Sequence, residues 1–491
     1  MSKFSPRRFK GAAIFLAKAL LMIGSVFLFL MTLIYFYREA MFPARGNYVL
    51  AFLYACILMT LSTTYECFKI GISRIKELVL SFAIAAGLTN FFTYLILSLI
   101  ESKLLSPVAL IGLTLAQIIY GIVIYTCANK IYFVIFPISS CVFVSSGSEY
   151  EQEILNKLQT NRSRVHIHKV INQDAGIEAI QNEMNKYNTI MIGDIDAELK
   201  NFMIKYCFEK NKSMYILPSV QDIVVNASTE YQFGDTVMFY SKSRSMSIEQ
   251  LAIKRLMDLA ISIVGLILAS PIMLIIALLI KLYDGGPVFF KQERYTRNEK
   301  VFTLIKFRSM IVDAEKDGAA FTVNNDSRIT PIGRFIRATR LDELPQLINI
   351  LKGDMSFVGP RPERIENVEN YSQKMPDFKY RMKVKAGLTG YAQIFGKYNT
   401  SCEDKARMDM LYIQNYSLFL DLKIIFYTFK VIFMKESTEG FATSGFENKK
   451  TEAEKLPAAE DKAAEKDKRI QLDVNDYIPE NLDRKNFAGN N

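Results

Sequence analysis

Residues 340–363 read RLDELPQLINILKGDMSFVGPRPE and place two adjacent acids, Asp342 and Glu343, before a short apolar run. Proline is favoured in the first turn of a helix and glycine just after its last residue, so Pro345 and Gly353 predict a short helix between them. The two carboxylates then lie at the positive end of the helix dipole, which favours their ionised forms. Their mutual repulsion opposes this unless a cation lies between them.

The acid pair therefore has two interpretations. A hard Mg²⁺ ion that arrives with a pyrophosphate substrate would offset the repulsion, since Mg²⁺ prefers oxygen ligands. Alternatively, the two acids cap the helix and have no chemical role. The pair alone does not decide between these interpretations.

The composition of the chain restricts its partners only loosely. Half of the 491 residues are hydrophobic, and 60 Lys and Arg residues against 50 Asp and Glu residues give a formal net charge of +10. This length allows several domains with ample cores. A basic excess suits an anionic membrane surface, phosphorylated substrates or nucleic acid. Because the motifs described below involve membrane and phosphate, no nucleic-acid partner is expected.

Four uncharged apolar stretches near the N-terminus are long enough, or nearly so, for a helix to cross the ~30 Å hydrocarbon core of a bilayer. They comprise residues 19–37, 47–65, 78–100 and 104–129. They predict a four-helix transmembrane bundle over residues 1–130. No ladder of buried acids or ion pairs runs through the stretches, so an anchor is favoured over a pore.

The flanking charges orient this bundle. Basic residues concentrate before the first stretch and between the second and third, at Lys3, Arg7, Arg8, Lys10, Lys69, Arg74 and Lys76. The other two loops carry only Arg38, Arg45 and Lys103. The positive-inside tendency then places both ends of the bundle in the cytoplasm. We expect a multi-pass protein of the bacterial cytoplasmic membrane, in contact with membrane lipids.

A fifth apolar stretch, residues 259–280, is interrupted in its middle by Ser270 and Pro271. Proline removes one helical hydrogen bond and clashes with the preceding turn, so it kinks or breaks a helix. A full crossing here would place everything that follows outside the cell. We therefore predict a re-entrant membrane hairpin over residues 259–283, which leaves the rest of segment 248–436 on the cytoplasmic side.

Residues 131–247 alternate short apolar runs with amphipathic stretches. The expected strands are 141–145, 165–171, 189–194 and 214–218, and the expected helices are 149–159, 176–186 and 197–209. This alternation predicts a βαβ domain with a parallel sheet, Rossmann-like in outline. The first strand is followed by SGSEYE and not by GxGxxG, so the dinucleotide fingerprint is missing and nucleotide binding is disfavoured.

Two short patterns in this domain are weak signals. Asp194 and Asp196 form a DxD pattern, which in many glycosyltransferases holds a metal and a nucleotide sugar, but capping of the helix that begins near Ala197 is favoured. His166 and His168 would share one strand face, and a solvated face is favoured over a metal site because no third ligand is evident.

The C-terminal residues differ from the rest in composition. Residues 447–468 read ENKKTEAEKLPAAEDKAAEKDK and are rich in charge and poor in large apolar groups. Such a segment cannot bury enough apolar surface to fold alone. We predict a disordered charged tail over residues 437–491.

Segment 250–436 contains no histidine and one cysteine, Cys402, which excludes Cys–His and Ser–His–Asp catalysis within it. Acids and bases remain, a combination that suits phosphoryl chemistry, where positioning and charge neutralisation do most of the work. The basic side chains fall in short clusters: Lys306, Arg308, Arg334, Arg337, Arg340, Arg361 and Arg364. Single arginines beside a membrane also snorkel to its surface without any substrate.

The motifs KRLMDLAIS, SPIML, GGPVFFKQER, FTLIKFRSM, RITPIGRFIRATRLDELPQLINILKGDMSFVGPRPE and AGLTGYAQ give this segment its resemblance to a known family. They resemble the bacterial sugar transferases, the polyprenyl-phosphate hexose-1-phosphate transferases, over about residues 250–436. The preceding bundle and fingerprint-lacking domain resemble the large multidomain members. One departure is Ala386, which stands before GLTG where many members carry proline.

The resemblance implies an enzyme that moves a sugar-1-phosphate from a UDP-sugar to undecaprenyl phosphate with Mg²⁺, releases UMP and initiates exopolysaccharide or capsule assembly. It implies an α/β-type catalytic domain with a re-entrant hairpin broken at Ser-Pro. It also implies that Asp342 is the nucleophile and that Glu343 is a catalytic residue that binds the metal. The implied substrate-binding residues are Lys306, Arg308, Arg337 and Arg361.

A nucleophilic aspartate also suits the acceptor, because a lipid phosphate with a second pKa near ~6 is mostly dianionic at pH 7 and needs no base. Two other functions stay open: a non-catalytic membrane scaffold with a nucleotide sensor, and a UDP-releasing glycosyltransferase that uses Asp194 and Asp196. Neither the sugar nor the oligomeric state follows from the sequence, and a homo-oligomer is compatible with it.

Overall fold

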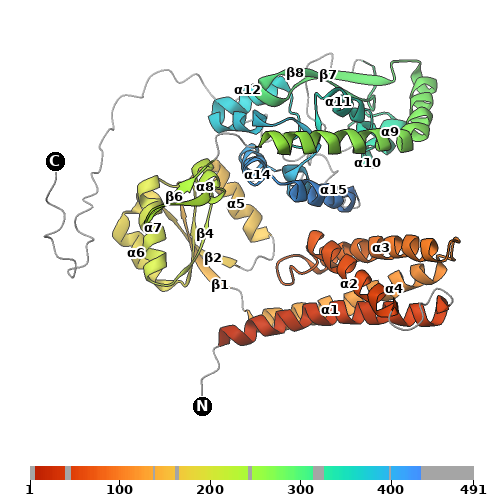
Figure 1. Cartoon of the computed structure of the whole chain (residues 1–491). Helices are drawn as coiled ribbons and strands as arrows, with labels where there is room; N and C mark the ends of the chain where they lie inside the picture. The colour runs from red at the N-terminus through yellow and green to blue at the C-terminus, as the bar shows by residue number, and fades with distance from the viewer. Residues whose placement is uncertain are drawn as a thin grey trace. The chain divides into compact units, whose positions relative to one another are not determined.

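The computed structural model describes residues 6–38, 46–136, 139–160, 165–241, 246–312, 314, 326–396 and 400–432 (Figure 1). Contacts place all of these residues in one unit, Met1–Gly440. The predicted tail, 437–491, lies outside the described residues, as does Arg45 of the first loop.

Four long helices contain nearly all of the predicted apolar stretches. Their bounds are α1 Pro6–Phe36, α2 Gly46–Thr64, α3 Ile75–Ile100 and α4 Val108–Ile135. Each is long and apolar enough to cross a membrane, as is a fifth helix described below. Uncharged runs of this length form helices in a bilayer because every backbone polar group must find its partner within the segment.

A buried polar network joins the four helices. The amide Nδ2 of Asn90 on α3 donates to Gln117 Oε1 on α4 (3.0 Å), and Tyr54 on α2 donates to Asn90 Oδ1 (2.9 Å). The Nε2 of Gln117 donates both to the hydroxyl of Tyr54 (2.7 Å) and to the carbonyl of Ser25 on α1 (3.2 Å). Such uncharged side chains hold helices together where lipid supplies no hydrophobic driving force.

A four-stranded parallel sheet follows, with strand order β2-β1-β3-β4. Its strands are β1 Ser139–Ser145, β2 Val165–Asn172, β3 Thr189–Ile192 and β4 Ser213–Ile216, and its helices are α5 Glu149–Thr160, α6 Ile177–Lys186, α7 Ala197–Glu209 and α8 Val220–Asn226. These bounds agree with the predicted elements to within about two residues, except that α8 was not anticipated. We call residues 139–226 the sheet domain.

An antiparallel hairpin between the sheet domain and the next helix was also not anticipated. It consists of β5 Thr229–Phe233 and β6 Thr236–Tyr240. Every residue of both strands is exposed, including several aromatic ones. The hairpin therefore lacks the alternating burial by which strands are recognised in sequence.

The fifth long helix, α9 Ile248–Asp284, contains the predicted interruption. Of the two outcomes expected at Ser270 and Pro271, a kink or a break, the structure has no break: α9 is one continuous helix with Pro271 inside it, and Figure 1 shows that it bends sharply within its length. Ser270 donates to the carbonyl of Ile267 (2.8 Å), which supplies part of what the proline removes. The re-entrant membrane placement stays a prediction.

The remaining elements follow α9 in the chain and contact both of its halves. They are β7 Phe289–Tyr295, β8 Val301–Phe307, α10 Pro331–Ala338, η4 Leu341–Glu343, α11 Gln346–Lys352, β9 Ser356–Val358, α12 Ile365–Lys374, η5 Pro376–Lys383, β10 Gly387–Thr389, α13 Tyr391–Phe395, α14 Cys402–Gln414 and α15 Leu418–Ile432. In the second half of α9, Ile276 and Ile280 pack with Ile336 of α10. In the first half, the guanidinium of Arg255 donates to the carbonyls of Ile350 (2.6 Å) and Leu351 (2.8 Å) at the end of α11. This contact fixes α11, and with it the acid pair that precedes α11.

Candidate active site

The acid pair lies on η4, a single 3-10 turn directly before α11. The predicted short helix is confirmed: α11 begins after Pro345 and ends at Gly353, whose φ of 90° is the left-handed conformation that glycine adopts without strain. The residue before η4, Arg340, also has a positive φ of 57°. This left-handed residue separates α10 from the turn that carries Asp342 and Glu343.

Cations from three separate segments surround the two acids. Lys306 comes from β8, Arg337 from α10, and Arg361 from the turn after β9. All three act electrostatically on Asp342, and the Nη2 of Arg361 forms an ion pair with Glu343 Oε1 at 3.0 Å. Four of the predicted site residues lie around Glu343 in this way, although they span more than fifty positions of the chain.

The two acids differ in their ionisation. Burial, helped by the negative charge of Glu343, raises the pKa of Asp342 from 3.8 to about 6, while Lys306 and Arg337 oppose the rise. Burial also raises the pKa of Glu343, but Arg361 and Arg340 outweigh it and hold that pKa below its ordinary value. The lowered pKa of Glu343 keeps that carboxylate ionised at neutral pH, whereas Asp342, with a pKa of about 6, takes up a proton under mildly acidic conditions.

Lys306 is held beside Asp342 in an unusual state. Burial lowers the pKa of Lys306 to about 8, and Arg294 and Arg337 add to that lowering against the attraction of Asp342. Its ammonium lies 4.9 Å from the centre of the Phe290 ring on the neighbouring strand β7, a cation–π contact. Burial therefore destabilises the charged form of Lys306 unless an anionic ligand binds beside it. Perturbed lysines of this kind are typical of functional sites.

Arg308, a predicted substrate-binding residue, is held elsewhere. Its guanidinium is buried and forms an ion pair with Asp284 at the end of α9. A Cβ on Gly286 would lie 2.3 Å from Nη1 of Arg308, so a glycine is needed there. Arg308 thus fastens the end of α9 to the strand that carries Lys306, and its role in substrate binding stays a prediction.

A second layer of charged residues supports Arg361 and was missed in the sequence. Arg381 on η5 is 4% exposed; its Nη2 forms an ion pair with Asp409 on α14 (2.7 Å) and donates to the carbonyl of Arg361 (3.0 Å). Burial raises the pKa of Asp409 to about 6 against the pull of Arg381. Glu363 lies 3.7 Å from Arg381 Nη1. No local pattern marks these residues, because the contacts join segments that are distant in sequence.

The donor set of the acid pair is compatible with Mg²⁺. Within the described part of the chain, no three His, Cys, Asp or Glu residues gather as a metal-binding group. Mg²⁺ is commonly held by one or two carboxylates together with substrate phosphates and water, so a full protein cage is not required. Glu343, ionised and partly exposed, is the acid that fits this role.

The weaker sequence signals lie in the sheet domain and not among the residues around the acid pair. Asp196 occupies the position before α7, but its side chain makes no capping hydrogen bond, so the predicted side-chain capping is wrong. Asp194 instead accepts a hydrogen bond from Arg407 on α14 at 2.9 Å. His166 and His168 are both exposed on one face of β2.

Comparison with known proteins places residues 249–435 in the bacterial sugar transferase family. The uncharacterized sugar transferase EpsL of Bacillus subtilis is 42% identical over 187 residues, which cover 38% of this chain and 90% of EpsL. This chain belongs to the bacterial sugar transferase family. The members of that family thus share the segment that holds the acid pair and its cations.

Two longer relatives carry activity names. A UDP-N-acetylgalactosamine-undecaprenyl-phosphate N-acetylgalactosaminephosphotransferase of Aeromonas hydrophila is 43% identical over 183 residues, 37% of this chain and 43% of the relative. A UDP-glucose:undecaprenyl-phosphate glucose-1-phosphate transferase of Klebsiella pneumoniae is 43% identical over 239 residues, 48% of this chain and 51% of the relative. The chain thus spans about half the length of these family members.

Proposed function

We propose that this protein transfers a sugar-1-phosphate from a UDP-sugar to undecaprenyl phosphate and releases UMP. The observation that carries the proposal is an acid pair with split ionisation inside a ring of cations, in a segment shared with family members that bear this activity. The relatives' names include N-acetylgalactosamine and glucose at the same identity, so the likeness does not select the sugar.

The first step uses the cations to bind the diphosphate of the donor. Lys306, Arg337 and Arg361 come from different elements and surround the place where Asp342 ends. A carboxylate oxygen of Asp342 attacks the β-phosphorus, the bond from that phosphorus to the oxygen of UMP breaks, and UMP leaves with the electron pair. Fixed cations are well suited to this step because phosphoryl transfer is governed by positioning and electrostatic stabilisation.

The second step returns the enzyme to its starting state. An oxygen of the dianionic lipid phosphate attacks the phosphorus of the aspartyl phosphosugar, and Asp342 departs as a carboxylate. The covalent intermediate means that the two anionic substrates never meet across one phosphorus atom. The bond between the sugar's C1 and its oxygen is not touched in either step, so the anomeric configuration is retained.

A Mg²⁺ ion bound through Glu343 would neutralise charge on the pyrophosphate and on the departing UMP. Arg361 already pairs with Glu343, and its side chain is 47% exposed, which leaves part of the guanidinium accessible for phosphate oxygens of the donor. The chain's own residues thus bind, orient and neutralise the donor around Asp342.

We further propose that α1–α4 form a transmembrane bundle, that the sheet domain is Rossmann-like, and that the catalytic segment lies at the cytoplasmic face. One contact supports this orientation. Glu66, in the basic loop between α2 and α3, pairs with Lys423 of α15 (3.3 Å) and accepts from the hydroxyl of Tyr427 (3.2 Å). The loop that the positive-inside tendency assigns to the cytoplasm therefore contacts the catalytic segment.

The decisive experiment incubates the purified protein with undecaprenyl phosphate, Mg²⁺ and a panel of UDP-sugars, and identifies the nucleotide released. UMP supports the proposal, UDP would indicate an ordinary glycosyltransferase, and no product with any donor would indicate a scaffold. In Asp342→Asn, UMP release and the hydroxylamine-labile adduct should both disappear. Turnover retained in that variant would remove the nucleophile role.

A further inference from the structure

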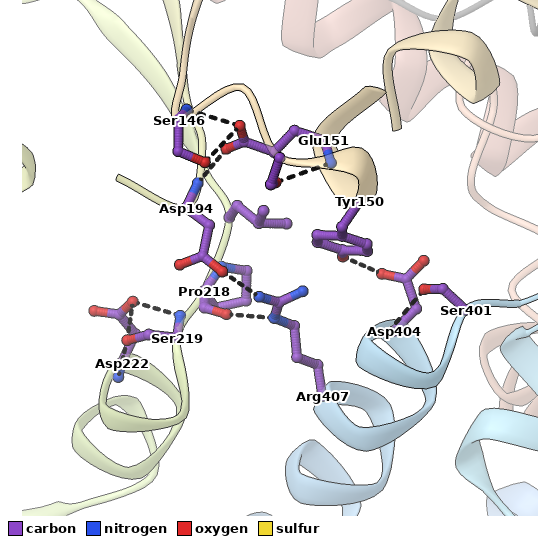
Figure 2. Close-up of polar contacts among 12 residues, drawn as sticks. Ser146, Tyr150, Glu151, Asp194, Pro218, Ser219, Asp222, Ser401, Asp404 and Arg407 are labelled. Carbon is purple, nitrogen blue, oxygen red and sulfur yellow. Dashed lines mark hydrogen bonds and ion pairs between the residues drawn. The ribbon is translucent and has the colours of Figure 1, made fainter. Parts of the chain in front are cut away.

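The carboxyl edge of the parallel sheet is occupied by a side chain of the protein itself. In open α/β sheets this edge is the usual ligand site. Here the carboxylate of Glu151, which is fully buried, accepts hydrogen bonds on Oε2 from Ser145 Oγ (2.6 Å), Ser146 N (2.8 Å) and Gly147 N (3.2 Å). Its Oε1 accepts from the backbone N–H of Asp194 at 2.6 Å (Figure 2). Glu151 thus joins the loop after β1 to the loop after β3.

The carboxylate of Glu151 packs so closely against Gly193 that a side chain at position 193 would clash with it. A Cβ at Gly193 would lie 2.0 Å from Glu151 Oε1 and 2.9 Å from the carbonyl of Val144. The loop therefore carries a glycine where the buried carboxylate passes. By fixing its own loop and that of Asp194, Glu151 sets the positions of two neighbouring side chains, Tyr150 and Asp194.

Both of these side chains contact Arg407 on α14 of the catalytic segment (Figure 2). Arg407 is 8% exposed, and its Nη2 donates to Asp194 Oδ2 at 2.9 Å while its Nε donates to the carbonyl of Pro218 at 2.9 Å. Its guanidinium also lies 4.7 Å from the centre of the Tyr150 ring. A two-point, stacked contact of this kind suits arginine and cannot be reproduced by lysine.

A second contact lies one turn earlier on α14. The hydroxyl of Tyr150 donates to the carboxylate of Asp404, and Lys157 Nζ lies 3.2 Å from Asp404 Oδ2. Asp404 is in the first turn of α14, where Ser401 caps the helix by accepting from the Asp404 N–H. We call the contacts of Asp404 and Arg407 with the sheet domain the α14 clamp.

The other side of α14 reaches the active site. With 3.6 residues per turn, Asp409 points roughly opposite to Arg407, two positions away. Asp409 holds Arg381, Arg381 holds the carbonyl of Arg361, and Arg361 pairs with Glu343. One rigid helix therefore lies between the sheet domain and the metal-binding acid of the proposed mechanism.

We propose that Arg407 is a positioning residue through which the sheet domain holds α14 in place. α14 in turn keeps Arg361 and Glu343 in the positions that catalysis requires. The sheet domain then acts as an intramolecular brace, with its ligand edge used for docking. The kinetic part of this inference rests on the proposed function.

The test compares two aspartates of the same loop in the full-length protein. Asp194 is 49% exposed on its side chain, so Asp194→Ala should fold, and it should lower kcat/KM for the UDP-sugar by about 3- to 10-fold. The matched control, Asp196→Ala, removes an exposed carboxylate two positions away that makes no capping bond, and should leave kcat/KM unchanged. Equal losses in both variants would overturn the inference and favour a DxD metal site.

A mutant cycle and a structural readout complete the test. Once Arg407→Ala is made, adding Asp194→Ala should cost nothing more, and Arg407→Lys should lie between the wild type and Arg407→Ala. Hydrogen–deuterium exchange over α14 should be faster in Asp194→Ala than in the wild type or in Asp196→Ala, with or without any UDP-sugar. Unchanged exchange and unchanged kinetics in Asp194→Ala would refute the brace. Because exchange needs no turnover, it decides the point even if the wild type releases no UMP.

Discussion

Replacing Lys306 with methionine should shift the pH–rate profile of the first chemical step, so that the rate falls at a higher pH on acidification. Asp342 attacks only as a carboxylate, and Lys306 is the strongest of the cations that hold its pKa down. Without that cation the pKa of Asp342 rises above about 6. A raised carboxyl pKa means that the reactive form is lost at a higher pH as the solution is acidified.

The size of the effect follows from the ionised fraction. With a pKa of about 6, roughly nine-tenths of Asp342 is ionised at pH 7 and roughly one-tenth at pH 5. An opposite charge within about 4–6 Å shifts a carboxyl pKa by about 1–3 pH units, and the partly exposed Lys306 should lie at the low end. Through the ionisation of Asp342 alone, a rise of about one pH unit would slow the step about fivefold at pH 6 and about twofold at pH 7, in addition to the loss of one cation at the diphosphate. Above pH 8 the difference should close, because the pKa of Lys306 itself is about 8 and the wild type loses the same charge.

The assay is single-turnover UMP release at fixed Mg²⁺ without undecaprenyl phosphate, since a lipid phosphate with a second pKa near ~6 would mask the aspartate. The control is Lys291→Met. Lys291 lies on the same hairpin but faces the other way, toward a cavity lined by Thr303, Ile305 and Lys352. An acid limb in Lys306→Met that coincides with that of the wild type, or lies below it, would refute the electrostatic role.

Three further predictions test other parts of the molecule. Glu343→Gln should raise the Mg²⁺ concentration needed for half-maximal UMP release, and an unchanged metal titration would assign the metal elsewhere. Asn90→Leu should lower the melting temperature in detergent, because it removes side-chain bonds that each contribute about 0.6–2 kcal/mol, whereas Thr126→Val, whose hydroxyl bonds within its own exposed turn, should not. Lys254→Met should destabilise the fold by about 3–5 kcal/mol, since it leaves the fully buried Asp421 without its cation, and a melting curve equal to that of the wild type would contradict this.

Local patterns predicted those parts of the fold that depend on local physics. Uncharged runs, alternating apolar strands and the Pro345–Gly353 signals each act over a few residues, so the apolar helices, the parallel strands and α11 agree with expectation. The break that the resemblance implied at Pro271 and the capping expected of the DxD pattern were not found, each for a physical reason. Ser270 repairs part of the hydrogen bonding at Pro271, so α9 bends and does not break. Asp194 accepts a hydrogen bond from Arg407, and Asp196 stands before α7 without a capping hydrogen bond from its side chain.

In the candidate site, too, local sequence patterns predict some residues and tertiary contacts determine the others. The acid pair is visible in sequence because both acids stand beside a helix start. The resemblance supplied Lys306 and Arg361, but nothing local could supply the support of Arg361, because Arg381 and Asp409 lie on segments distant in sequence and meet only in the folded chain. Which arginines lie at the acids and which, like Arg308, serve another contact is decided by tertiary packing.

The use of the sheet's carboxyl edge bears on the nucleotide-sensor alternative. A nucleotide phosphate at this edge would need the backbone N–H groups of Ser146, Gly147 and Asp194, which already donate to Glu151. Displacing a fully buried carboxylate would break all of these bonds, leave the carboxylate to be rehydrated, and release the loop that presents Asp194 to Arg407. The same geometry that excludes an anion therefore makes the domain a firm support. A sensor and a brace are competing uses of one edge, and the buried Glu151 favours the brace.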